Sequence, residues 1–373
     1  MISVKGKNVY TGDSVKINSY INFKDSKVYS ITEKPEGVVA GEFHTITPAF
    51  IDAHCHIGMF RAGEPAEEAD VNDHMDSILP LIDALDSIQM DDTAFKDSIE
   101  YGVLYSCVLP GSGNIIGGMS AVIRNYGFDT NDAFIASAGL KAAFGYNTMS
   151  PYSREKKGRR ASTRMGCIAI LRSEFYKVMN EKKEEKLSAE QRILKELLDG
   201  QLTLRVHVHK SDDIAAVLRL VDEFNLKITI EHACNVYRKE TFEELAKRNI
   251  PVVCGPIEGI GPKVELKNMN WHNLKVMIES GVKFGVMTDH DINPQCNLFY
   301  VTRHLIRSGI SKEQAIESIT KTNAEIIGID DILGTLTRNK WASFTCWNGD
   351  PFSMLSYPEK IYAEGRVIFE ESD

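Results

Sequence analysis

The stretch that decides the fold is FHTITPAFIDAHCHIG, residues 43–58. Its apolar run, 49–53, leads directly into His54 and His56. Side chains on a strand alternate between its two faces, so the two histidines share one face and Cys55 points to the other, where we interpret it as a packing residue. Two neutral imidazoles at one strand end form a partial site for Zn, Mn, Fe or Ni, although two buried core histidines would give the same pattern.

Apolar runs of strand length recur along the middle of the chain, and segments with helical periodicity separate most of them. We expect strands at 49–53, 103–109, 120–124, 138–144, 204–208, 228–231, 251–255 and 283–287, and helices at 212–225, 241–248 and 312–327. Eight strands alternating with helices predict a parallel (β/α)8 TIM barrel. A doubly wound open sheet is the alternative, but no GxGxxG motif follows the first strand.

Both ends of the chain are rich in strand-forming residues. Short alternating runs broken by turn residues fill 1–47 and 335–373, and AEGR, at 363–366, predicts a hairpin between two such runs. We therefore expect the two end segments to form one small β-sandwich domain, and residues 48–334 to form the barrel domain that carries the site.

The composition of the chain limits the classes of molecule that it is expected to bind. The chain has 373 residues, 43% of them hydrophobic, a net charge of −9 and a pI near 5.7, which argue against nucleic acid or an anionic membrane. The sequence shows no apolar segment of about 20 residues and no signal-peptide pattern. Seven scattered cysteines without a CxxC pair are typical of a reduced, cytoplasmic protein. We expect a small-molecule substrate and leave a homo-oligomer open.

More histidines end the later predicted strands. His207 and His209 follow one strand, His232 the next, and Asp289 and His290 the last, so six of the ten histidines lie at strand ends. Scattered core histidines would not gather there, and a metal site is therefore favoured. Asp289 can bind a metal and accept a proton from water, or it can be the N-cap of the following segment.

Lys141 lies in the otherwise apolar strand 139–145. A buried lysine is costly as a cation, so it needs a partner or a lowered pKa. Pairing with a carboxylate such as Asp289 is one solution. From the residues alone, this solution and a neutral amine both stay open.

The quoted motif resembles the opening motif of the amidohydrolase superfamily, whose usual form is tPGfiDaHcH; Ala49 stands where glycine is usual. Supporting stretches are STRMG, HVHKSDDI, IEHA, TDHDIN and ITKTNAEIIGID, while KWASFTCW replaces the usual KDADLVVW near the end. The chain is similar to imidazolonepropionase-related and prolidase-like amidohydrolases along nearly its whole length.

The resemblance implies a metal-activated hydroxide that attacks an amide, a cyclic amide or another C–N bond. It implies a divalent cofactor, with zinc expected, at one or two ions per chain. One ion would be held by His54, His56 and Asp289, the other by His207 and His232. Asp289 would be the catalytic proton shuttle, and a carboxylated Lys141 would bridge two metals.

The resemblance also implies the substrate contacts His209, Arg164 and His290. Arg164, in STRMG, ends a basic run, 154–164, that would form either a lid or a solvated loop, and it suits a carboxylate-bearing substrate. A mononuclear deaminase is one alternative, but Lys210 stands where the related deaminases usually carry an acid. A non-catalytic scaffold is another, but such chains typically lose ligands, and this one keeps all five.

Overall fold

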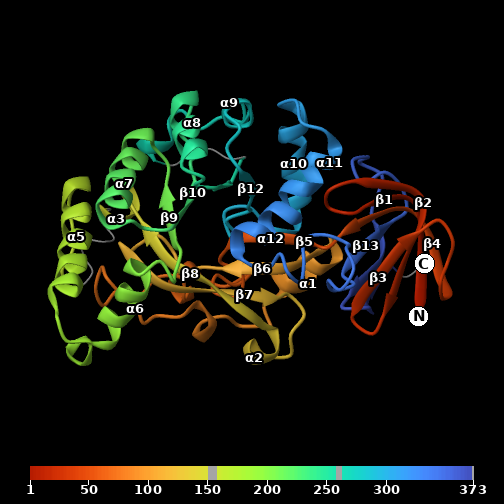
Figure 1. The fold of residues 1–373 in the computed structure, drawn as a ribbon, viewed down its shortest axis with the longest axis horizontal. Helices are drawn as coiled ribbons and strands as arrows, with labels where there is room; N and C mark the ends of the chain where they lie inside the picture. The colour runs from red at the N-terminus through yellow and green to blue at the C-terminus, as the bar shows by residue number, and fades with distance from the viewer. Residues whose placement is uncertain (150–157, 258–262, 372–373) are drawn as a thin grey trace.

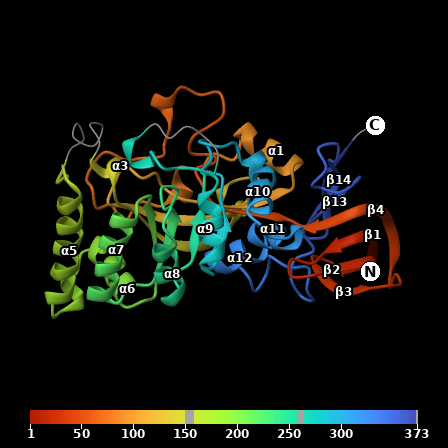
Figure 2. The same cartoon turned by 90° about the horizontal axis from the view of Figure 1, so that it is seen from above.

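A computed structural model describes residues 1–149, 158–257 and 263–371. Two sheets organise these residues: an eight-stranded sheet in the middle of the chain and a seven-stranded sheet built from its two ends. Figure 1 shows strands from both ends of the chain together in the second sheet, and Figure 2 shows the helices lying along the outside of the first.

The eight-stranded sheet is the barrel, with the strand order β12-β11-β10-β9-β8-β7-β6-β5. Most of its strands are buried on both faces, as their largely apolar runs predict, whereas the first half of β8 is partly exposed. They are β5 Phe50–Cys55, β6 Val103–Val108, β7 Ile116–Arg124, β8 Phe134–Ala143, β9 Leu204–Val208, β10 Ile228–His232, β11 Val252–Cys254 and β12 Phe284–Val286.

Helices cover the barrel from outside. They are α1 Thr93–Glu100, α2 Thr130–Ala133, α3 Tyr146–Met149, α5 Arg164–Asn180, α6 Ala189–Leu198, α7 Ser211–Phe224, α8 Lys239–Lys247, α9 Asn273–Glu279, α10 Leu298–Arg307, α11 Lys312–Ser318 and α12 Lys321–Ile327. Short 3-10 turns lie at Ala66–Glu68, Ala84–Asp86, Glu184–Lys186, Val264–Leu266 and Gln295–Asn297. Within the described ranges, no helix combines the length and the apolar character needed to cross a membrane.

The barrel departs from the expected all-parallel arrangement at one strand. β7, predicted at 120–124, pairs antiparallel with both β6 and β8, whereas the other paired strands run parallel. A parallel connection needs a crossover of about a dozen residues or more. The chain leaves β6 at Val108 and enters β7 at Ile116, which is too short for one. Strands β6, β7 and β8 therefore form an up-and-down meander inside an otherwise parallel TIM barrel.

Backbone hydrogen bonds join the first and last barrel strands at the carboxyl end of the barrel. The amide of Asp289 donates to the carbonyl of His54 (3.2 Å), and the amide of His56 donates to the carbonyl of His290 (2.7 Å). The chain beyond β12 therefore runs beside the end of β5. This β5–β12 junction places the residues after both strands next to one another.

The β5–β12 junction is also stabilised nearer the start of the two strands, where a predicted helix is interrupted. The single helix expected at 312–327 is two helices, α11 and α12. The break frees the carbonyl of Ile319 to accept a hydrogen bond from the amide of Ile51 (2.9 Å). In α12, the amide group of Asn323 donates to the carbonyls of Ile51 (2.6 Å) and Val286 (2.8 Å), one on β5 and one on β12.

The terminal strands form a mixed sheet with the order β15-β14-β13-β4-β1-β2-β3. The ring of Phe23, on β2, lies 5.6 Å from those of Phe344 and Tyr362, although two strands separate it from β13 and three from β14, so the sheet folds over on itself into a sandwich. Its strands are β1 Ile2–Tyr10, β2 Val15–Lys24, β3 Lys27–Thr32, β4 Val38–Pro48, β13 Phe344–Trp347, β14 Pro358–Ala363 and β15 Arg366–Glu370. Only Ala49 separates β4 from β5.

Candidate metal centre

The five predicted ligands meet at the carboxyl end of the barrel, the end at which TIM-barrel enzymes carry their sites. Asp289 lies centrally among them. Its Oδ1 is 3.7 Å from His54 Nε2 and 3.4 Å from His56 Nε2, and its Oδ2 is 4.0 Å from His232 Nδ1. The structure thus brings residues from β5, β10 and the segment after β12 to one point.

The two histidines of the first strand present the same ring nitrogen to this point. His56 Nδ1 lies 2.7 Å from the carbonyl oxygen of Leu109, and His54 Nδ1 lies 3.0 Å from Glu231 Oε2. Both partners are acceptors, so each Nδ1 carries the ring proton. The unprotonated Nε2 of each ring therefore lies on the side of Asp289, and that of His54 also lies 3.1 Å from Lys141 Nζ.

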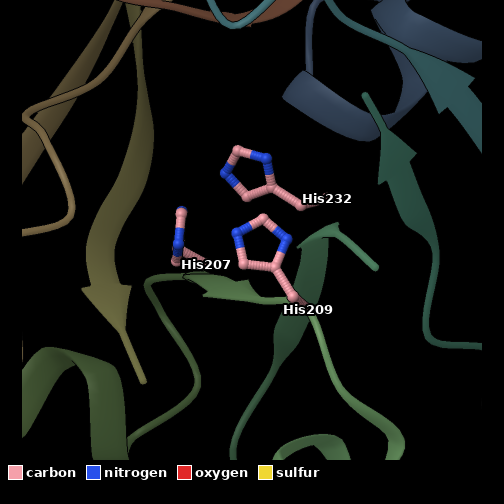
Figure 3. Close-up of side chains that lie close together, drawn as sticks. All are labelled: His207, His209 and His232. Atoms are coloured by element: carbon pink, nitrogen blue, oxygen red, sulfur yellow. The ribbon is translucent and has the colours of Figure 1, made fainter. Parts of the chain in front are cut away.

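His232 also belongs to a compact group of three histidines, shown in Figure 3. The ring centroid of His207 lies 4.1 Å from that of His232 and 4.7 Å from that of His209. One ligand nitrogen from each ring lies within 4.8 Å of the other two. His209, predicted as a substrate contact, therefore lies inside the cluster of candidate ligands rather than beyond it.

The unpaired nitrogens of this group test whether a metal fits. His232 Nδ1 lies 2.8 Å from the carbonyl oxygen of Gly255. His232 Nε2 and His209 Nδ1 are buried and have no hydrogen-bond partner among the described residues. A buried polar atom without a partner costs about 1–3 kcal/mol. A divalent transition metal binds neutral imidazole nitrogens and carboxylate oxygens. The unpaired nitrogens beside Asp289 therefore fit a bound metal of this kind.

The direction of His232 depends on an unusual backbone conformation. Glu231 points into the barrel, so strict alternation would turn the next side chain outward. His232 instead has a φ of 75°, in the left-handed region, and Ala233 follows at 53°. Asp289 also has a positive φ, 55°. Positive φ is uncommon for residues other than glycine and is often held at functional sites.

The electrostatics of the pocket keep the histidines neutral. Burial lowers the pKa values of His54, His207 and His232 well below 6.5, and it lowers that of His209 to about 3, with help from the positive charge of Lys263. Burial by itself would raise the pKa of Asp289, but His232 and His56 outweigh it, so this pKa falls below its usual value. The centre therefore offers neutral nitrogens and an ionised carboxylate at neutral pH.

Lys141 is fully buried beside the first-strand ligands. Its Nζ lies 3.1 Å from His54 Nε2, so its hydrogen-bond partner is a candidate metal ligand rather than Asp289. Burial lowers the pKa of Lys141 from 10.5 to about 8, against the opposing charges of Asp289 and Glu231. A larger share of this amine is neutral near physiological pH than in an exposed lysine.

His290 also has a defined ring proton. Its Nδ1 accepts a hydrogen bond from the backbone amide of Gln295 (3.1 Å), so its Nε2 carries the hydrogen. The residue is 8% exposed and directly follows Asp289. It can therefore act as a hydrogen-bond donor at the rim of the centre.

Arg164 is held at the mouth of the barrel between two acids. Its Nε lies 2.8 Å from Asp213 Oδ1, its Nη2 lies 3.1 Å from Glu265 Oε2, and its side chain is 45% exposed. Lys263, which the sequence reasoning missed, is a second cation here. Burial lowers its pKa, against the opposing charges of Glu265 and Asp289.

The rest of the basic run falls into two parts. Arg154, Lys156 and Lys157 lie outside the described residues. Arg159 pairs with Glu174 (3.3 Å), and Arg160 donates to Asn114 Oδ1 (2.8 Å). The described part of the run therefore binds neighbouring loops and helices.

The sequence reasoning also missed Arg205 and Glu231. Both are fully buried, and Arg205 Nε donates to Glu231 Oε1 at 3.0 Å. The sequence pattern could have identified both residues, since each is a charged residue inside an otherwise apolar strand, as Lys141 is. Glu231 is moreover the side-chain partner of His54.

Comparison with known proteins places this chain in a family. The sequence model of the amidohydrolase family matches residues 161–368. Amidohydrolase tasK of Hapsidospora irregularis is 22% identical over 97% of this chain, which spans 40% of that protein's length. An amidohydrolase from Thermotoga maritima MSB8 superposes with a TM-score of 0.92 at 29% identity over the full length of both chains.

A prolidase crystallised with N-methylphosphonate-L-proline has the same fold, with a TM-score of 0.63 at 14% identity over 99% of this chain and all of that one. The chain belongs to the amidohydrolase family, as its motifs predicted.

Proposed function

We propose that this protein is a metal-dependent hydrolase that cleaves a C–N bond at a centre of two divalent metals. The substrate would be an amide, a cyclic amide or a dipeptide-like molecule that carries a carboxylate. The observation that carries the proposal is the position of Asp289, within 4.0 Å of ring nitrogens of His54, His56 and His232. Zinc suits a set of imidazole and carboxylate ligands.

His54, His56 and Asp289 would hold one ion, and His207 and His232 the other. Such ions supply Lewis acidity and a nucleophilic hydroxide at neutral pH. Asp289 takes the proton of the attacking water and delivers it to the leaving nitrogen, because its ionised carboxylate accepts protons at the centre of the ligand set. The Nε2 hydrogen of His290 stabilises the negative charge that develops on the carbonyl oxygen.

Lys141 completes the binuclear arrangement in this proposal. Its neutral amine would add carbon dioxide and release one proton to solvent, and the two oxygens of the carbamate, which share one negative charge, would be available as ligands to the two cations. The contact of its Nζ with His54 Nε2 and its lowered pKa support this role.

The substrate carboxylate is assigned to the cations at the mouth. Arg164 keeps two fixed contacts to carboxylates, which orient its guanidinium, and Lys263 contributes a second positive charge on the same side. Fixed guanidinium groups are favoured partners for carboxylates.

Metal analysis together with a substrate screen tests the proposal. Protein purified without chelator should contain close to two equivalents of metal and should hydrolyse members of a set of N-acyl amino acids, dipeptides and cyclic amides. Lys141→Ala should lose metal and activity and regain part of both with short carboxylic acids. A single fully occupied metal beside an unmodified Lys141 would contradict the binuclear centre.

A further inference from the structure

Arg205 and Glu231 form an ion pair in the interior of the barrel, below the histidines. Both side chains have 0% exposure, and their closest atoms are 3.0 Å apart. Taking two charges out of water costs several kcal/mol per ion, and apolar residues of similar volume often serve stability as well or better. The pair is therefore poorly explained by stability.

The hydrogen bonds of Glu231 show what the pair does. Its Oε1 accepts from Arg205 Nε (3.0 Å) and from the hydroxyl of Thr229 (2.5 Å), while its Oε2 faces His54 Nδ1 (3.0 Å). One carboxylate oxygen is thus held by two donors, and the other serves a candidate ligand. Arg205 Nη2 also donates to the carbonyl of Ala53 (2.9 Å), directly before that ligand.

The orientation of His54 differs in kind from that of His56 and His232. The Nδ1 atoms of His56 and His232 face backbone carbonyls, of Leu109 and Gly255. Those acceptors are neutral, whereas the acceptor of His54 is a carboxylate. A carboxylate behind a ligating imidazole fixes its tautomer and raises its basicity.

We propose that Glu231 is the positioning residue of His54, and that Arg205 holds Glu231 in place. The pair makes the metal position at His54, His56 and Asp289 the one that depends on a charged partner. At the other position, the hydrogen-bond partner behind His232 is the neutral carbonyl of Gly255. This inference rests on the proposed two-metal centre and adds to it a difference between the two positions.

The test compares metal binding in Glu231→Gln, Arg205→Met/Glu231→Leu and wild type. Gln keeps an acceptor for His54, whereas the double variant removes the acceptor without leaving a buried charge unpaired. Zn²⁺ affinity and stoichiometry are measured by chelator competition, and the coordination of Co²⁺ by its visible absorption. The melting temperature of each apoprotein reports any loss of structure.

Asn22→Ala is the matched control. Asn22 is also fully buried and hydrogen-bonded, but it lies in β2 of the terminal sheet, where its Nδ2 donates to Thr32 (2.7 Å). This variant should lower the melting temperature of the apoprotein and leave metal affinity and the Co²⁺ spectrum unchanged.

The double variant should lose about one of two metal equivalents, with affinity at that position falling about 10- to 100-fold. Glu231→Gln should lie between it and wild type, and the remaining Co²⁺ should keep one part of the wild-type spectrum. Variants that bind both ions with wild-type affinity would overturn the inference alone. Wild-type protein that binds neither Zn²⁺ nor Co²⁺ would overturn the proposed function and the inference with it.

Discussion

Replacement of Lys141 by methionine should stabilise the metal-free protein. The fall in the pKa of Lys141 from 10.5 to about 8 corresponds to a penalty of roughly 3 kcal/mol for the buried ammonium at neutral pH. Methionine has nearly the same volume and carries no charge. It loses the hydrogen bond to His54, worth about 1 kcal/mol. The expected gain in the free energy of unfolding at pH 7 is therefore about 2 kcal/mol.

This gain should depend on pH in a defined direction. Between pH 8 and 10.5 the unfolded lysine holds a proton that the folded lysine has released, so wild-type stability rises with pH across this window. The variant has no such group. Its advantage should be complete below pH 8 and should disappear as the pH approaches 10.5.

Urea denaturation of chelator-treated protein at pH 7 and at pH 10 measures both effects. Lys96→Met is the control, because Lys96 is 82% exposed and its replacement should change stability by less than about 0.5 kcal/mol. A Lys141→Met protein less stable than wild type at pH 7 would refute the reasoning. So would a difference in stability that is the same at both pH values.

Four other variants test the site and the fold. His54→Ala and His232→Ala should each remove metal and activity, as measured by elemental analysis and turnover. The far-ultraviolet circular dichroism should stay unchanged, because the ligands lie above the packed core. Unfolding of either variant would contradict this prediction. Asp289→Asn should reduce kcat far more than metal content, and near-normal turnover on a verified substrate would exclude the proton shuttle. Asn323→Ala loses two buried hydrogen bonds and should lower the free energy of unfolding, measured by urea denaturation, by about 2 kcal/mol. An unchanged midpoint would show that the β5–β12 junction does not need these two hydrogen bonds.

The sequence predicted the barrel well where local pattern decides the structure. The apolar run 204–208 is β9 with the same bounds, and the helix expected at 212–225 is α7 shifted by one residue. The predicted direction of β7 was wrong, because apolar periodicity identifies a strand but carries no information on its direction. The length of the connection from β6 to β7 would have given it.

The site could be predicted to the level of which residues gather, but not how they point. Strand ends alone brought His54, His207 and Asp289 together. The inward turn of His232 depends on its left-handed backbone, which no local pattern shows. The partnership of Arg205 with Glu231 depends on the pairing of β9 with β10, so it becomes visible only when the register of the two strands is known.

The junction of β5 with β12 has a consequence for the order of folding. These two strands come from opposite ends of the barrel segment, and joining them closes a long loop whose entropy cost is repaid by few contacts. The amides of His56 and Asp289 form the last hydrogen bonds across this closure, and both residues are metal ligands in the proposed centre. Ligand binding stabilises the state to which it binds, so metal should hold this closure shut. Slow exchange of these two amide protons with deuterium would then report metal occupancy in the absence of any substrate.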